Sequence, residues 1–169
     1  MSTLAQLRSA GLVALAAVLA GLVGFDRSRN DKPAGVRTHA LVGAGGAMVV
    51  VVSRTLVGEV GDASRAVHAM VTGIGFLGAG TILRDRSRRS ISGLTTAASL
   101  LVAAAVGTAI GSGLLVLGVL VTVVVLAVLN VRWLLVRTGI DATALEAPRA
   151  TGPGGPRDEI EQEPMEQNA

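Results

Sequence analysis

The sequence predicts an all-α membrane protein, a bundle of about five short, glycine-rich transmembrane helices. Half of the 169 residues are apolar, 22 are glycine and 16% are charged, which leaves too little polar surface to cover a soluble domain of this size. The apolar residues stand in blocks that supply the roughly 17–25 residues needed to cross a bilayer. Spans of this length must form helices or a closed barrel, and the alternation typical of a barrel is absent.

Five apolar blocks define the expected helices. The first carries Gln6 and Arg8 near its start and lacks a convincing small-residue cleavage site, so we expect a retained helix rather than a cleaved signal peptide. Arg54 interrupts the second block, and its long side chain can reach the interface. A glycine- and serine-rich stretch, residues 107–113, predicts a tight turn between the fourth and fifth helices. The helices are expected at residues 4–25, 39–57, 66–83, 90–110 and 113–136, inside a transmembrane domain of residues 1–137.

The basic residues of the loops predict an orientation. Four precede the second helix, four lie between the third and fourth, and two lie at the exit of the fifth. The opposite helix ends carry Arg8, Arg54 and Arg65. Because short cytoplasmic loops are enriched in Lys and Arg, we expect the N-terminus outside and the C-terminus in the cytoplasm.

Residues 138–169 differ in character from the rest. They hold 7 acidic and 2 basic residues, together with a proline- and glycine-rich stretch. Such a composition cannot bury enough apolar area to offset the entropy of ordering the chain. We expect a disordered acidic tail.

The composition argues against several functional classes. There is no cysteine, and no Asp or Glu falls inside an apolar block, so we expect neither a metal centre nor a cofactor. The hydroxyls have only His39 and His68 as bases, without an orienting acid in the membrane, which predicts a protein that is not an enzyme. The basic region is interleaved with apolar blocks and suits a lipid bilayer. With 3 aromatic residues, base-stacking platforms and nucleic-acid binding are not expected.

The third block contains a glycine pattern with two interpretations. Gly73, Gly75 and Gly78 match the GxGxxG fingerprint of dinucleotide sites. That fingerprint requires a preceding strand and an acidic residue about 20 positions later, and neither is present. Together with Gly80, these glycines instead put small residues on both sides of the helix, where neighbouring backbones approach closely. The pattern therefore predicts packing glycines and a third helix at the centre of the bundle.

The same helix carries a polar stripe. His68, Thr72, Gly75 and Ala79 share one face, and Arg65 lies one turn before His68. One interpretation is a histidine that bonds to a neighbouring helix. The other is a small polar patch that faces a cavity, because ionisable groups inside a membrane are candidates for function.

Hydroxyl side chains open the fourth helix. Thr95, Thr96 and Ser99 lie in its first turns, and Thr95 and Ser99 share a face. Such hydroxyls commonly bond back to helix carbonyls or across to another helix. A packing role is favoured over a functional one.

Three stretches together resemble the MgtC/SapB family of bacterial membrane proteins. They are residues 32–42 (KPAGVRTHALV), 72–83 (TGIGFLGAGTIL) and 93–98 (GLTTAA), and the resemblance covers about residues 10–135. Two positions depart from the pattern: Asp26 replaces a common Glu, and Leu101 a common Trp. The positions that match the family signature are Arg37, Thr38, His39, Gly73, Gly75, Gly78, Gly80, Thr95 and Thr96.

The resemblance implies a multi-pass protein of the bacterial inner membrane, linked to magnesium limitation or membrane energetics. Similar proteins associated with virulence are thought to act on the membrane part of the ATP synthase rather than to pump magnesium. The chain is expected to be a short member without the C-terminal cytoplasmic domain of longer ones. It also has neither a P-loop nor an aspartyl-phosphate motif.

We therefore expect an accessory or regulatory membrane protein that acts by helix–helix contact with a membrane partner. The alternative is an oligomeric transporter of a small solute or ion such as magnesium, built from several copies of the chain. A membrane enzyme is the third and least supported interpretation.

Overall fold

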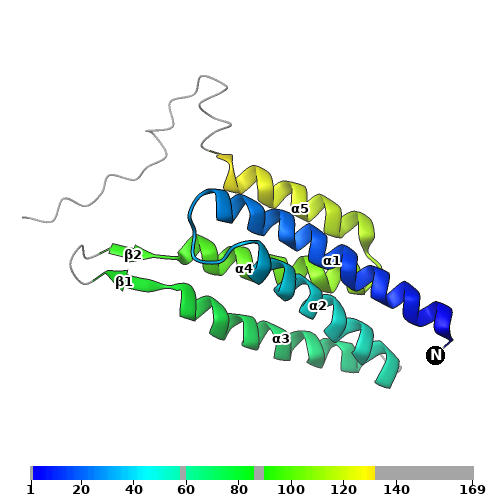
Figure 1. Cartoon of the computed structure of the whole chain (residues 1–169). Helices are drawn as coiled ribbons and strands as arrows, with labels where there is room; N and C mark the ends of the chain where they lie inside the picture. The colour runs from blue at the N-terminus through cyan, green and yellow to red at the C-terminus, as the bar shows by residue number, and fades with distance from the viewer. Residues whose placement is uncertain (1, 58–59, 86–89, 132–169) are drawn as a thin grey trace, which may run out of the picture. The chain divides into compact units, whose positions relative to one another are not determined.

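Five helices and a short hairpin make up residues 2–57, 60–85 and 90–131, the part of the chain that the computed structural model describes (Figure 1). Three helices are long and apolar enough to cross a membrane, which confirms the predicted all-α membrane fold. The predicted tail, residues 138–169, and the predicted end of the fifth helix, residues 132–136, lie outside the described residues. The helices are α1 (Thr3–Arg29), α2 (Val36–Val57), α3 (Val60–Thr81), α4 (Leu94–Gly111) and α5 (Leu115–Leu129).

The connection between α3 and α4 contains a hairpin that the sequence did not predict. Strand β1 (Leu83–Asp85) pairs antiparallel with β2 (Ser90–Ser92). The expectation that helix continued to residue 83 and resumed at residue 90 is therefore wrong. Gly93 explains the later start of α4, because its φ of 92° is a left-handed conformation that favours glycine. A side chain there would also collide with the carbonyl oxygen of Thr81.

The helix at the centre of the bundle is α4. It packs against α1, α2, α3 and α5, whereas α3 packs mainly against α2 and α4. In Figure 1, α3 and α5 accordingly lie at opposite edges of the bundle. The prediction that the third helix is central is wrong, because α3 packs mainly against α2 and α4, and no neighbour among the described residues lies beside Gly73, Gly75 and Gly80.

The contact between α2 and α4 depends on residues with little or no side chain. A methyl group added at Gly111 would lie 2.6 Å from the carbonyl oxygen of Ala47, and one added at Gly107 would overlap the carbonyl oxygen of Gly43. Each helix thus presents two small residues four positions apart, a spacing that lets membrane helices approach closely. This contact fixes the depth at which polar residues of α2 and α4 face each other.

A tight turn joins α4 to α5, as the glycine- and serine-rich stretch predicted. Gly113 has a φ of 85° and donates its N–H to the carbonyl oxygen of Ile110 at 2.9 Å. Leu114 donates to the carbonyl oxygen of Ala109, also at 2.9 Å. This pair of bonds is the Schellman motif, which ends a helix at a left-handed glycine.

Candidate functional site

His39 lies in the first turn of α2, where that helix meets α1. The helix begins at Val36 because the hydroxyl oxygen of Ser28 accepts the Val36 N–H at 3.1 Å. Gly24 of α1 lets the two backbones approach, since a methyl group there would lie 2.8 Å from the Cβ of His39. His39 is consequently buried, with 0% of its surface exposed.

The imidazole of His39 is hydrogen-bonded on both sides. Its Nδ1 lies 3.0 Å from the carbonyl oxygen of Gly35, and its Nε2 lies 3.0 Å from the Oγ of Ser99. Because a carbonyl oxygen can only accept, Nδ1 donates. Ser99 Oγ also lies 2.8 Å from the carbonyl oxygen of Thr96. Its single hydrogen therefore goes either to His39 or to Thr96, and in the second case Nε2 must donate as well.

Arg27 extends these contacts into α1. Its Nη2 donates to the Oγ1 of Thr96 at 3.0 Å, and the side chain is 5% exposed. Arg27 follows Ala16, Ala20 and Val23 at spacings of four, three and four, which places all four on one helix face. That face is buried along its length. We call Arg27, His39, Thr96 and Ser99 the polar network; it joins α1, α2 and α4.

A second polar contact ties α1 to α5 at the same end of the bundle. Asn130 donates from Nδ2 to the Oδ1 of Asp26 at 2.8 Å and to the carbonyl oxygen of Leu126 at 2.9 Å. The other carboxylate oxygen of Asp26, Oδ2, is buried without a hydrogen-bond partner among the described residues. Asp26 is thus directed toward α5 and away from the polar network.

The predicted site residues of α2 and α4 fall into a buried group and an exposed group. It brings His39 and Thr96 into one network across two helices. It leaves Arg37 and Thr38 exposed at the start of α2, and Thr95 exposed at the start of α4. The motif at the start of α2 thus combines one buried anchor with two outward-facing residues.

The predicted residues of α3 face away from the bundle. Arg65, His68 and Thr72 are exposed, and the hydroxyl of Thr72 donates to the carbonyl oxygen of His68 in the same helix at 3.0 Å. The interpretation that His68 bonds a neighbouring helix finds no such bond to a described residue. The polar stripe of α3 therefore lies on its outer surface.

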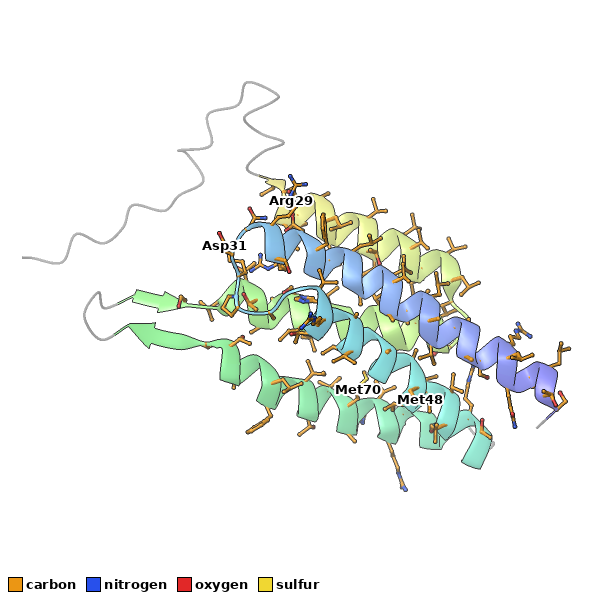
Figure 2. The ribbon with its side chains drawn as sticks, viewed as in Figure 1. Arg29, Asp31, Met48 and Met70 are labelled. Atoms are coloured by element: carbon orange, nitrogen blue, oxygen red, sulfur yellow. The ribbon has the colours of Figure 1, made fainter. Side chains whose placement is uncertain are left out.

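Of the four predicted packing glycines, Gly78 has a neighbour in this chain. A methyl group added to Gly78 would lie 3.4 Å from the Cβ of Ala97 in α4. Around Gly73, Gly75 and Gly80, no described atom outside their own helix backbone lies within 4 Å of such a methyl. A packing role for these three stays a prediction that requires a partner beyond the described residues. Opposite this face, Met70 points into the bundle, where its sulfur accepts the hydroxyl of Thr108 at 3.7 Å (Figure 2).

The polar network suits positioning better than chemistry. Ser99 and His39 stand at the separation of a nucleophile and its base, but they are 3% and 0% exposed and enclosed by α1, α2 and α4. Inside a membrane protein, buried polar groups that bond across helices fix the packing of those helices. Among the described residues, no group of three or more His, Asp or Glu side chains could hold a metal ion.

Comparison with known proteins places most of the chain in one family. The sequence model of the MgtC family matches residues 13–137. YhiD of Escherichia coli (strain K12), provisionally named a magnesium transporter, is 44% identical over 124 residues, which cover 69% of this chain and 57% of YhiD. Protein SrpB of Synechococcus elongatus is 39% identical over 127 residues, covering 69% of this chain and 70% of SrpB.

Protein MgtC of Brucella abortus (strain 2308) is 41% identical over 120 residues, covering 71% of this chain and 49% of MgtC. The chain therefore spans only about half the length of YhiD and of this MgtC. No solved structure matches the chain.

Proposed function

The chain belongs to the MgtC family of membrane proteins, and from that membership we propose that it is a non-enzymatic accessory or regulatory protein of magnesium homeostasis. In this proposal it crosses the bacterial inner membrane several times and acts by helix–helix contact with a membrane protein partner. The names of YhiD and MgtC support the link to magnesium.

The observation that carries the proposal is the outer face of α3. Gly75 lies on this face in one stripe with the exposed His68, and Gly73 and Gly80 lie on the adjoining side of the helix. A methyl group added to any of the three would meet no described atom outside its own helix backbone within 4 Å. Glycine inside a helix costs up to about 1 kcal/mol relative to alanine. No contact with the described residues offsets this cost at the three glycines. The cost is explained if another helix packs closely on this face. Phe76, 80% exposed on the same helix, would add apolar area to such a contact.

The interior of the bundle supports contact rather than conduction by a single chain. Two clusters of buried apolar side chains follow one another along the length of the bundle. The backbones of α2 and α4 are in close contact beside these clusters. The polar side chains of the network bond to one another. A solute path through one copy would have to separate these contacts.

An oligomeric transporter is the second candidate function. The provisional name of YhiD favours it, and the outer face of α3 could equally receive a second copy of the chain. The two functions differ in a measurable way, because transport survives purification and regulation of a partner does not. Purified protein in liposomes should carry no magnesium or proton flux if the first proposal is right.

The test in cells replaces a glycine on the outer face of α3. Gly75→Leu meets no described neighbour, so it should insert and accumulate normally yet fail to support growth at low magnesium. Ala127→Leu, on the exposed face of α5, is the matched control and should complement fully. A membrane partner should co-purify with the control protein and be lost with Gly75→Leu; the membrane part of the ATP synthase is the first candidate to look for. Full complementation by Gly75→Leu would show that the outer face of α3 is not the contact surface.

A further inference from the structure

A polar cavity of about 320 Å³ lies at the end of the bundle where the loop before α2 meets the start of α4. Figure 2 shows Asp31 in that loop, just beyond the end of α1. The volume is several times what one water molecule needs. The cavity is lined by Arg27, Asp31, Lys32, Pro33, Ser92, Gly93, Thr95 and Thr96.

Arg27 brings a buried positive charge to this cavity. Its side chain is 5% exposed, and one of its nitrogens, Nη2, is bonded to Thr96. Another, Nε, is buried without a hydrogen-bond partner among the described residues, and no described carboxylate forms an ion pair with the guanidinium. Asp26, its neighbour in sequence, bonds Asn130 instead. A charge withdrawn from water in this way costs several kcal/mol unless an opposite charge compensates it.

The start of α4 provides a second feature that favours an anion. No side chain caps this end of the helix, and its first turn contains no acidic residue. The first backbone bond at this end runs from Ala97 to Gly93, and the N–H groups before it have no partner within the helix. Such N–H groups and the helix dipole together attract negatively charged groups, phosphate above all. Thr95 and Thr96, in the same first turn of α4, also line the cavity.

We infer that this cavity binds a phosphate group, held by Arg27, by Lys32 and by the N-terminal end of α4. Among the described residues, the ionisable groups that line the cavity are Arg27, Lys32 and Asp31, which together carry one net positive charge before the helix dipole is added. That charge matches the single negative charge of a phosphodiester, as in the headgroup of phosphatidylglycerol. Inorganic phosphate offers the same oxygens from the aqueous side. Arginine is suited to either source, because its fork of N–H groups matches two phosphate oxygens.

The experiment measures thermal stability of the purified full chain in a neutral detergent at fixed ionic strength. The probes are phosphatidylglycerol, phosphatidylcholine and inorganic phosphate, each titrated to give a midpoint concentration for the rise in Tm. A rise with phosphatidylglycerol alone identifies a lipid headgroup as the source. A rise with inorganic phosphate, alone or in addition, identifies a site open to soluble phosphate. No rise with any of the three probes contradicts the inference.

Two charge-matched variants separate a site from general surface attraction. Lys32→Gln removes a charge that lines the cavity, and should raise the midpoint concentration on the order of ten-fold. Arg29→Gln removes the same charge from an exposed residue at the end of α1 that does not line the cavity, and should leave the midpoint unchanged. Equal effects of both variants would mean that the anion is attracted to the whole basic end, and the inference would be wrong.

A third variant tests the helix end without disturbing Arg27, whose replacement could unfold the protein. Thr95→Asp puts a carboxylate into the exposed first turn of α4, where it can satisfy the helix dipole itself. The variant should have a Tm at or above that of the parent without any probe, and should no longer respond to the probe that stabilises the parent. A response that persists at full size would show that the anion binds elsewhere.

Discussion

The hydroxyl hydrogen of Ser99 determines how the polar network is bonded. It is donated to His39 when Nε2 carries no hydrogen, and to the carbonyl oxygen of Thr96 when Nε2 carries one. In both arrangements His39 keeps its bond to Gly35. The contact between α2 and α4 is thus retained whichever protonation state the histidine adopts.

We expect Ser99→Ala to lower the stability of the bundle, because it leaves the buried Nε2 of His39 without a partner. An unsatisfied buried group costs about 1–3 kcal/mol. Ser9→Ala in α1 is the matched control, since the Ser9 hydroxyl is bonded to no described residue, and it should change stability by less than about 0.5 kcal/mol. Thermal unfolding of both variants in the same detergent makes the comparison. Equal Tm values would show that Ser99 does not hold His39.

The sequence singles out three of the four residues of the polar network. His39 and Thr96 stand in motifs that resemble a known family, and Ser99 is among the hydroxyls expected to bond to helix carbonyls or to another helix, as it does. Arg27, by contrast, was assigned to a loop. The reason is the predicted end of the first helix at residue 25, four residues before its actual end at Arg29. The spacing of Arg27 from Ala20 and Val23 is the signal that would have placed it on the buried face.

The glycines that hold the helices together are not those of the most conspicuous motif. The GxGxxG pattern in α3 predicts glycines that pack against neighbouring helices, yet Gly73 has open space around it. Gly107 and Gly111 were assigned to the turn after α4, although both lie inside that helix and against α2. Glycine spacing alone cannot tell a helix face in contact with a neighbour from one that faces outward. Helix number and approximate limits could be predicted, because they depend on block length; the choice of central helix could not.

Two substitutions of the same kind separate these glycines. Gly107→Ala must push α4 away from the backbone of Gly43, and overpacking of this kind costs about 1–3 kcal/mol. Gly73→Ala has free space and should raise the stability of the purified chain by up to about 1 kcal/mol through helix propensity. Chemical unfolding of the two variants in detergent measures the difference. If Gly107→Ala were as stable as Gly73→Ala, the claim that the backbones of α2 and α4 are in close contact at Gly107 would be wrong.

At the scale of the whole molecule, two hydrogen bonds tie together the end of α1, the start of α4 and the end of α5 at one end of the bundle. Asn130, after α5, bonds Asp26 of α1, and Arg27 bonds Thr96 at the start of α4. The loop before α2, the hairpin and the end of α5 therefore lie at the same end of the bundle. The sequence assigns four, four and two basic residues to these connections. Their charges add, so the positive-inside rule predicts one orientation for the whole bundle.

Reporter fusions test this orientation. A fluorescent protein fused after Arg137 should be fluorescent, and alkaline phosphatase fused there should be inactive, because the positive-inside rule predicts a cytoplasmic location for that position. Alkaline phosphatase inserted at Asp62, near the start of α3, should be active in the periplasm. The reverse pattern at both positions would show that the bundle has the opposite orientation in the membrane.

The central claim is that the outer face of α3 contacts another membrane protein, and photo-cross-linking in cells tests it most directly. The photoreactive residue benzoylphenylalanine replaces Phe76 on α3 or, as a control, Val124 on α5; these side chains are 80% and 59% exposed. At low magnesium, we expect position 76 to give a discrete adduct with a different membrane protein, and position 124 to give none. An adduct of position 76 with a second copy of the chain, or no protein adduct from position 76, would contradict the claim.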